Sequence, residues 1–352
     1  MSDTKPTVFK KNLIAALQKA KNVSITGHIN PDYDALASAV AMKKYLDIAF
    51  PDVEKVVVFE GANSDEEPLF PEINEITWID ELQSGIADAD VSIFVDGSPH
   101  VRFTHSPEKL DFTGKTTFCI DHHLNIPDHY DYILNDSNKS SCTQIIAELF
   151  FDKEQFKDKF LSELILFGIL SDTGTFRYLE ARHADALILV IEILKESDLN
   201  IQSLYQRLST VSRECYKIFQ ELVRNTRFVK LANCKHGIMY SYLSNEMAAK
   251  YNDKTLRAAR SLYLFNSHRN VRGYPWGFVV APEKDTFSAS FRSTPGALNL
   301  MPVIRHLGGG GVAMAGGITI SKDNTRFKTE EIVQEIIDKL KSFDFSQSYL
   351  KS

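Results

Sequence analysis

Residues 23–38, VSITGHINPDYDALAS, constrain the fold of this chain more than any other stretch. Residues 23–25 form an apolar run that predicts the end of a β-strand, Gly27 predicts a turn, and the apolar spacing of residues 35–46 predicts a helix. A strand that leads through a short turn into a helix is the repeating unit of α/β proteins. The stretch therefore predicts the first strand and the following helix of a parallel sheet.

Three side chains of the metal-ligand type lie in this turn, namely His28, Asp32 and Asp34. One imidazole and two carboxylates crowded at the end of a strand favour a divalent cation between them. Mixed nitrogen and oxygen ligands suit manganese, zinc or iron better than calcium. The alternative is a helix N-terminus at which Asp32 and Asp34 cap backbone amides and complement the helix dipole. Taken alone, the turn favours the capping role, because aspartate is common at helix starts.

Other predicted element ends carry residues of the same type. Residues 90–99, DVSIFVDGSP, and residues 116–123, TTFCIDHH, predict two further buried strands, each followed by acidic residues or histidines. Residues 160–170 have helical spacing and lead into the sequence SDTGTF. The side chains that these ends supply are Asp96, Asp121, His122, His123 and Asp172. Because ligands bind beyond the carboxyl ends of the strands in such sheets, we expect these side chains to converge with the first turn.

The alternation of predicted strands and helices indicates an α/β fold with a doubly wound, mostly parallel sheet. Residues 201–225 predict one long helix. Beyond it, residues 277–281 and 286–292 predict a β-hairpin within a smaller C-terminal α/β domain. We therefore expect a metal-binding domain, a helical connector and a C-terminal domain, over residues 1–195, 196–228 and 229–345.

The composition is that of a globular protein, with 43% hydrophobic and 24% charged residues in a chain of 352 residues. The formal net charge of −6 excludes a generally basic nucleic-acid coat, but bound metal can still attract short anionic substrates. The four cysteines have no CxxC spacing, which favours free thiols in a reducing compartment. No signal-peptide pattern and no stretch of ~18 apolar residues occurs. We therefore expect a cytoplasmic protein without a membrane partner.

Six candidate ligands predict a site for two divalent metal ions that share one carboxylate, and they are His28, Asp32, Asp34, Asp96, His122 and Asp172. Two metal ions about 3.5–4 Å apart lower the pKa of a bridging water and stabilise both oxygens of an in-line displacement at phosphorus. The planar guanidinium of Arg292 suits a phosphate, and Ser293 adds a hydroxyl. The glycines at 308–311 allow backbone amides to approach an anion or a base. The alternatives are an interdomain salt bridge for Arg292 and a tight turn for the glycines.

GHINPDYDA, VDGSP, IDHH and SDTGTF resemble, in order and spacing, the four motifs of the DHH phosphoesterases. SFRST and GGGGVAMAGG are similar to the arginine-serine and glycine-rich motifs of the DHH-associated C-terminal domain. The resemblance covers nearly the whole chain. It is closest to the nano-RNases, the bifunctional oligoribonuclease and 3′-phosphoadenosine 5′-phosphate phosphatase subgroup. It implies a manganese-dependent enzyme, with its active site in the cleft between the two domains, that releases nucleoside 5′-monophosphates from very short RNAs.

The same resemblance assigns roles to the candidate residues. By this resemblance the first metal ion is held by His28 and Asp32, the second by Asp34, His122 and Asp172, and Asp96 bridges the two. His123 stays off the metal ions and contacts the bridging water or the scissile phosphate. Asp121 orients the neighbouring imidazole as a hydrogen-bond acceptor. Arg292 and Ser293 bind the terminal phosphate of the substrate.

Two positions depart from the family pattern. Tyr33 occupies a position that is usually small, which predicts a narrower cleft or a ring for base stacking. The glycine-rich motif of the family normally reads GGGH, and its histidine position is Gly311 in this chain. Gly309, Gly310 and Gly311 remain candidates for backbone contacts with the substrate. We expect His306, two residues before the glycine run, to reach the place of the missing histidine.

The sequence thus predicts a phosphoesterase that trims short oligoribonucleotides or dinucleotides. These residues do not determine whether it cleaves in the 3′-to-5′ or the 5′-to-3′ direction. Two alternatives also stay open: a phosphatase of 3′-phosphoadenosine 5′-phosphate or another small nucleotide, and a catalytically weak nucleotide-binding regulator. A long-DNA exonuclease of the RecJ type is disfavoured by the acidic chain, and an inorganic pyrophosphatase by the glycine-rich second domain. The oligomeric state is open as well, and a homodimer is among the expected assemblies.

Overall fold

The computed structural model describes residues 5–62, 70–124, 127–322 and 328–349. The chain forms two compact units, Met1–Thr210 and Val211–Ser352, and each is described here by itself. The described residues also form short 3₁₀ helices, namely η1 (Pro71–Glu75), η2 (His100–Arg102), η3 (Pro107–Lys109), η4 (Gln155–Lys157), η5 (Ala181–His183) and η6 (Phe345–Ser348). Within the described ranges, no helix combines the length and the apolar character that a membrane crossing requires.

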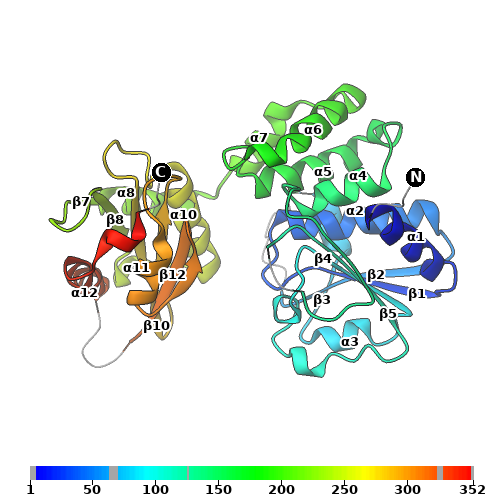
Figure 1. Cartoon of the computed structure of the whole chain (residues 1–352), viewed down its shortest axis with the longest axis horizontal. Helices are drawn as coiled ribbons and strands as arrows, with labels where there is room; N and C mark the ends of the chain where they lie inside the picture. The colour runs from blue at the N-terminus through cyan, green and yellow to red at the C-terminus, as the bar shows by residue number, and fades with distance from the viewer. Residues whose placement is uncertain (1–4, 63–69, 125–126, 323–327, 350–352) are drawn as a thin grey trace. The chain divides into compact units, whose positions relative to one another are not determined.

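The first unit is built on a six-stranded sheet in which every pair of neighbouring strands is parallel (Figure 1). The strand order is β3-β2-β1-β4-β5-β6. The strands are β1 (Asn22–Thr26), β2 (Glu54–Glu60), β3 (Thr77–Ile79), β4 (Val91–Val95), β5 (Thr116–Asp121) and β6 (Tyr132–Asn135). This order reverses direction between β1 and β4, as a doubly wound sheet requires. The predicted fold class is therefore confirmed.

Helices cover both faces of this sheet (Figure 1). They are α1 (Lys5–Leu17), α2 (Tyr33–Ala49), α3 (Leu82–Ile86), α4 (Cys142–Phe150), α5 (Lys159–Asp172), α6 (Ala184–Ser197) and α7 (Ile201–Ser209). Ile93 and Val95 of β4 join the core under α1, α2, α4 and α5, whereas Phe94 joins the smaller core under α3. Because both faces of the sheet are covered, all five residues of β4 are buried, and four of them are apolar. The sheet consequently presents polar side chains mainly where its strands end.

The second unit has a mixed six-stranded sheet in the order β11-β12-β10-β9-β8-β7, in which only β8 and β9 pair in parallel among the described strands. Its strands are β7 (Arg227–Val229), β8 (Ile238–Tyr242), β9 (Trp276–Pro282), β10 (Thr286–Ser293), β11 (Gly310–Val312) and β12 (Ala315–Ser321). Its helices are α8 (Arg213–Arg224), α9 (Asn245–Ala248), α10 (Asp253–Asn266), α11 (Leu300–His306) and α12 (Thr329–Lys341). The predicted hairpin is confirmed, because β9 and β10 are antiparallel neighbours.

The prediction of one long helix over residues 201–225 is wrong. Helix α7 ends at Ser209, and α8 begins at Arg213 after a break. The hydroxyl of Ser212 accepts a hydrogen bond from the amide of Cys215 at 3.1 Å and caps the second helix. A side chain that satisfies the first free amides of a helix favours a start at that point over a continuous helix. The boundary between the two units, after Thr210, falls in this break.

Candidate metal centre

The turn after β1 combines a helix cap with a buried imidazole. Asp32 caps α2, since its Oδ1 accepts hydrogen bonds from the amides of Asp34 and Ala35, both at 3.0 Å. His28 is buried, and its Nδ1 lies 2.9 Å from the carbonyl oxygen of Ile29. When Nδ1–H donates to this carbonyl, the other ring nitrogen, Nε2, keeps its lone pair for a ligand. The capping role and the ligand role of this turn therefore coexist.

Asp96, directly after β4, lies at the centre of the site. Its backbone has φ +61°, an unusual value for a residue other than glycine, and its side chain is completely buried. Oδ2 lies 3.4 Å from Nε2 of His28, and Oδ1 lies 3.4 Å from Nε2 of His122. Neither oxygen has a hydrogen-bond partner among the described residues. Burial raises the pKa of Asp96, but the imidazoles of His122 and His28 outweigh this effect and hold its pKa well below the usual range.

The end of β5 supplies an acceptor and two imidazoles. Oδ1 of buried Asp121 accepts hydrogen bonds from the amides of His122 and His123 at 2.8 and 3.1 Å, and it lies 2.8 Å from Nδ1 of His123. These contacts fix both histidines at the strand end. Nε2 of His122 lies 2.9 Å from Oδ2 of Asp172, the last residue of α5, and 3.9 Å from Oδ2 of Asp34. The strand ends and a helix end thus meet at one place.

Asp34 is held by residues that the sequence reasoning missed. Its Oδ2 accepts a hydrogen bond from the amide of Cys142 at 2.7 Å, and its Oδ1 accepts from the amide of Thr143 at 3.0 Å and from the Thr143 hydroxyl. A Cβ atom at Gly168 would lie 2.2 Å from Oγ1 of Thr143 and 2.9 Å from Oδ1 of Asp34. The missing side chain of Gly168 therefore lets α5 pack against this contact. Ser141, which caps α4, is the local sequence feature that marks the helix start at which Cys142 and Thr143 contact Asp34.

The six predicted ligands form two groups that meet at Asp96. Ligand atoms within 4.8 Å of one another are supplied by His28, Asp32 and Asp96 in one group and by Asp34, His122 and Asp172 in the other. His123 also lies within this distance of Asp96 and His122. Burial, with the carboxylates of Asp96 and Asp172, raises the pKa of Asp32 to about 6. Burial lowers the pKa of His122, but the neighbouring carboxylates outweigh it and raise that pKa to about 11.

This electrostatic pattern fits bound metal. The four carboxylates of the site repel one another. Several buried atoms of the site also lack hydrogen-bond partners among the described residues, including Nε2 of His28 and both oxygens of Asp96. Leaving such groups buried and unpaired costs several kcal/mol, about 1–3 for each group. A divalent cation in each group would satisfy them with oxygen and nitrogen ligands together. The residues present therefore fit the metal ions that the motifs implied.

The remaining candidates lie in the second unit. Arg292 and Ser293 end β10, and Nη1 of Arg269 donates a hydrogen bond to the carbonyl oxygen of Ser293 at 3.1 Å. Ser293 is completely buried. The ring of His306, at the end of α11, lies against Phe343 with 5.0 Å between the ring centroids. The contact that we predicted between His306 and a substrate stays a prediction.

The position assigned to the family histidine has no room for a side chain. A Cβ atom at Gly311 would lie 2.4 Å from the carbonyl oxygen of Ala315 and from Cα of Gly316 in the facing strand. At Gly309 a Cβ atom would lie 2.2 Å from the carbonyl oxygen of Gly317, whereas Gly310 has nothing within 4 Å. Gly311 is thus required by the close approach of β11 and β12. The correspondence of Gly311 to the histidine position of the family motif stays a prediction.

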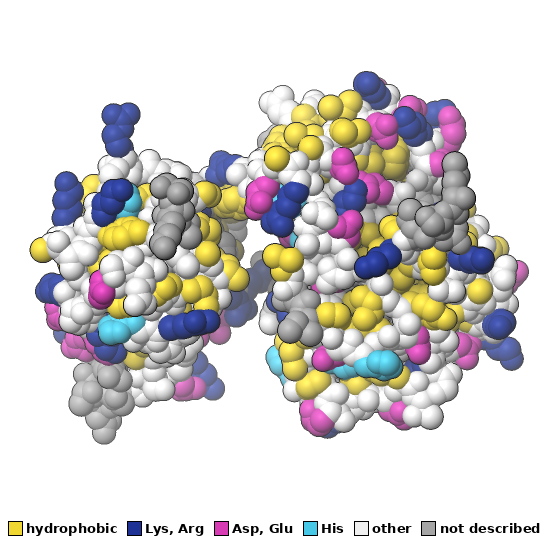
Figure 2. All heavy atoms as spheres, viewed as in Figure 1, with side chains coloured by type: hydrophobic (Ala, Val, Ile, Leu, Met, Phe, Trp, Pro, Cys, Tyr) yellow, Lys and Arg dark blue, Asp and Glu magenta, His cyan; other side chains and the backbone are white. Residues whose placement is uncertain are grey.

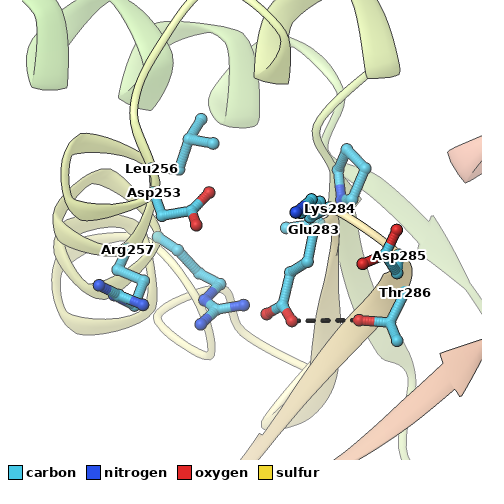
Figure 3. Close-up of a pocket in the computed structure, with 10 residues that line it drawn as sticks. Asp253, Leu256, Arg257, Glu283, Lys284, Asp285 and Thr286 are labelled. Atoms are coloured by element: carbon cyan, nitrogen blue, oxygen red, sulfur yellow. Dashed lines mark hydrogen bonds between the residues drawn. The ribbon is translucent and has the colours of Figure 1, made fainter.

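A cavity of about 310 Å³ lies elsewhere in the second unit, between α10 and the turn that joins β9 to β10 (Figure 3). Asp253 and Arg257 line it from the helix, and Glu283 lines it from the turn, where its carboxylate accepts a hydrogen bond from the Thr286 hydroxyl at 3.2 Å. Its charged groups are of both signs, and it contains none of the predicted site residues. The histidine and aspartate cluster of the first unit therefore stays the candidate functional site.

Comparison with known proteins finds a family model that resembles the region of the site. Residues 22–169 match the model of the DHH family, N-terminal domain, and this region contains all of the candidate ligands except Asp172. The first unit is thus similar to this family. The match and the relatives described next support a phosphoester hydrolase.

Two curated relatives align over most of the chain. The probable bifunctional oligoribonuclease and PAP phosphatase NrnA of Streptococcus mutans is 26% identical over 337 residues, which cover 95% of this chain and 100% of that protein. The bifunctional oligoribonuclease and PAP phosphatase NrnA of Bacillus subtilis is 23% identical over 319 residues, with 89% and 93% covered. The resemblance to this group that the six motifs predicted is confirmed.

Solved structures share the fold. An exopolyphosphatase-related protein from Bacteroides fragilis superposes with a TM-score of 0.77 at 19% identity, over 96% of both chains. RecJ from Thermus thermophilus, solved in complex with Mn²⁺, superposes with a TM-score of 0.51 at 13% identity, over 98% of this chain and 55% of RecJ. At these identities the likeness concerns the fold alone.

Proposed function

We propose that this chain hydrolyses short oligoribonucleotides and dinucleotides to nucleoside monophosphates with the help of two divalent metal ions. The observation that carries the proposal is the placement of Asp96, whose two oxygens face His28 and His122 separately, one from each ligand group. A carboxylate in this position is suited to bridge two cations. The names of the relatives, which include oligoribonuclease, support the substrate class.

The proposed ligands follow the two groups. His28 and Asp32 would hold one ion, Asp34, His122 and Asp172 would hold the other, and Asp96 would contact both. Such a pair of ions, most consistent with Mn²⁺ for this mixture of carboxylates and imidazoles, supplies an activated water and charge stabilisation at phosphorus. The residues of this site contribute ligand geometry, and three of the six, His28, Asp34 and Asp96, are buried and shield the site from water.

His123 and the residues after β10 would act on the substrate. Nδ1 of His123 lies against Asp121, which leaves its half-buried Nε2 to form a hydrogen bond with the reacting phosphate. We propose that the Arg292 guanidinium and the Ser293 hydroxyl bind the terminal phosphate of the same substrate, with the backbone of the glycine-rich strand beside it. We also propose that the chain works as a homodimer.

A second candidate activity is the removal of the 3′-phosphate from 3′-phosphoadenosine 5′-phosphate, because both relatives are named as PAP phosphatases as well. The same two ligand groups suit a phosphomonoester and a phosphodiester. The two activities differ in what the substrate-binding residues must accept, so a panel of substrates separates them.

The test is hydrolysis of a substrate panel in the presence of Mn²⁺: RNA dinucleotides, RNA pentamers, 3′-phosphoadenosine 5′-phosphate, pyrophosphate and long single-stranded DNA. We expect nucleoside monophosphates from the dinucleotides and pentamers. Asp96→Ala should lower kcat/KM on them by about 10³-fold or more, equivalent to about 4 kcal/mol of transition-state stabilisation. Asp88→Ala, an exposed aspartate before the same strand, is the matched control and should change little.

Three results would contradict the proposal. Substantial activity in the Asp96→Ala variant would exclude the bridging role. Hydrolysis of pyrophosphate or long DNA in preference to short RNA would change the substrate class. Tight nucleotide binding without any product would support a regulator instead of an enzyme.

A further inference from the structure

The loop that follows α5 folds back beside the candidate metal centre. Asp172 is the last residue of α5, and its Oδ2 lies 2.9 Å from Nε2 of His122. Further along the chain, the amide of Tyr178 donates a hydrogen bond to the carbonyl oxygen of Thr173 at 3.0 Å. This bond closes the loop over residues 173–178, so the chain returns to the place where the loop began.

The backbone of this loop has an unusual conformation. Gly174, Thr175 and Phe176 have φ values of +55, +56 and +69°, so three consecutive residues are left-handed. A β-branched residue and an aromatic residue rarely adopt this region, because their Cβ atoms crowd the backbone. Such conformations persist where the surrounding structure enforces them, and they gather at active sites and ligand clamps. The strained backbone therefore points to a role of this loop at the site.

The aromatic ring of Tyr178 lies directly on Gly174. A Cβ atom at Gly174 would lie 2.4 Å from Cε2 and 2.6 Å from Cδ2 of Tyr178, so the missing side chain makes room for the ring. The side chain of Tyr178 is nevertheless 51% exposed. Because consecutive Cα atoms are about 3.8 Å apart, Cα of Gly174 lies within about 8 Å of Cα of Asp172. Tyr178 thus presents a partly exposed ring close to the ligand groups.

Exposure alone does not make an aromatic side chain a binding group. Other hydrophobic side chains are exposed on the first unit, and in Figure 2 they gather where Figure 1 places α6 and α7. Single exposed apolar side chains are normal on globular proteins. Three observations together distinguish Tyr178: its loop begins at a predicted ligand, its ring lies on a glycine, and the backbone that carries it is strained.

A nucleobase is the chemical group that suits an exposed ring in this place. Bases stack on aromatic side chains with little regard to sequence, because every base has a flat π face. The proposed metal ions would act on the phosphate of a substrate and leave its bases to other residues. A ring next to the metal ligands is within reach of a base whose phosphate lies at the ligand groups.

We propose that Tyr178 is a base-stacking residue of the active site, on which one base of a short oligoribonucleotide lies during hydrolysis. The inference rests on the proposed function, because it takes oligoribonucleotides as the substrates. It adds a specificity-determining residue that the six motifs did not assign. The competing explanation is structural, with the ring only covering the backbone of Gly174.

The test removes the ring, the base, or both. The full chain is titrated by calorimetry, with Mn²⁺ present, with a diadenosine dinucleotide whose phosphorothioate linkage resists hydrolysis and with two analogues that each lack one base. In the wild type, loss of the stacked base should weaken binding about 10-fold. Tyr178→Leu should weaken binding of the complete dinucleotide about 10-fold, and loss of the same base should then have little further effect, since a cycle of this kind isolates the contact between the two groups.

Two further variants control for indirect effects. Tyr178→Phe keeps a ring that can stack and should bind all three dinucleotides as the wild type does. Tyr216→Leu removes a tyrosine that is 52% exposed on α8 of the second unit, and it should also leave the cycle unchanged. Thermal unfolding of each variant shows whether it remains folded.

Turnover of an ordinary dinucleotide gives a second measurement. Tyr178→Leu should raise KM about 10-fold with little change in kcat, because stacking acts on the bound substrate and on the transition state alike. The calorimetric cycle needs no turnover, so coupled binding without hydrolysis would contradict the proposed function and leave the inference intact. A wild-type chain that binds no dinucleotide, or base-removal effects that are the same in the wild type and in Tyr178→Leu, would overturn the inference.

Discussion

The carboxylate of Asp34 joins two helices that lie 108 residues apart in the sequence. It belongs to the first turn of α2, and its oxygens accept the amides of Cys142 and Thr143 at the start of α4. These bonds fix the orientation of the carboxylate before any ligand binds. Hydrogen bonds to a ligating carboxylate set its direction and basicity, so α4 would determine how the proposed ligand Asp34 presents its oxygens to a metal ion.

Replacement of Thr143 tests this role. Thr143→Val keeps the size of the side chain but removes the hydroxyl that donates to Asp34 and contacts Ser38 at 2.9 Å. We expect it to lower the affinity for Mn²⁺ by about 10-fold, the lower end of the effect of such contacts. Thr143→Ser retains the hydroxyl and should bind Mn²⁺ nearly as the wild type does. Calorimetric titration with Mn²⁺ measures both, and equal affinities in the two variants would argue against a role of the hydroxyl.

The sequence predicted that the candidate ligands lie together, but it did not predict the residues that hold them in place. His28, Asp96 and His122 follow apolar runs, and parallel strands bring their carboxyl ends to one edge, so the pattern alone predicts that they meet. Thr143 and Gly168 act through contacts between helices. Neither residue has a sequence pattern that distinguishes it from an ordinary helical residue, because the reason for its identity is a partner far away in the chain.

Among the elements, the hairpin of β11 and β12 shows that a run of glycines does not by itself indicate the role of each glycine. A run of four glycines predicts backbone freedom, but it does not indicate which glycine is needed for which contact. The structure separates them: Gly311 lies against Ala315 and Gly316, and Gly310 is open. Apolar spacing was also insufficient to place the ends of α7 and α8. The helical spacing continues across the break between them, and the break is set by the Ser212 cap.

A pair of alanine variants tests the packing of this hairpin. Gly311→Ala should lower the free energy of unfolding by about 1–3 kcal/mol, because the new Cβ forces the two strands apart. Gly310→Ala is the matched control and should stay within about 0.5 kcal/mol of the wild type, since nothing lies within 4 Å of its Cβ position. Urea unfolding of the full chain measures both. Equal stability of the two variants would show that β11 can move away at no cost.

At the scale of the whole molecule, the two units bury titratable groups for different reasons. The first unit gathers carboxylates and imidazoles in groups that could hold metal ions. Among its described residues, the second unit buries the imidazole of His268. Nε2 of His268 lies 3.0 Å from the carbonyl oxygen of Met239 in β8, and the ring packs near Tyr263.

The buried imidazole makes the stability of the second unit depend on pH. Burial, with the nearby charges of Arg269 and Arg292, outweighs the hydrogen bond to Met239 and lowers the pKa of His268 from 6.5 to about 3. Between these two pH values the unfolded chain binds a proton that the folded chain does not. The contribution of His268 to the free energy of unfolding is therefore complete above pH 6.5 and is lost as the pH falls toward 3. The limiting slope is about 1.4 kcal/mol per pH unit.

The measurement compares the wild-type side chain with His268→Gln, which fills a similar volume and does not titrate. Both are studied in a Trp78→Phe background, so that fluorescence reports Trp276, which is completely buried in the core of the second unit. Urea unfolding from pH 7.5 to 4.5 should show a difference in unfolding free energy, wild type minus variant, that declines as the pH falls below 6.5. Because acidic groups elsewhere affect both proteins equally, their contributions cancel in this difference. Parallel stability curves for the two proteins would mean that His268 is protonated in the folded state, with its charge accommodated beside Arg269 and Arg292.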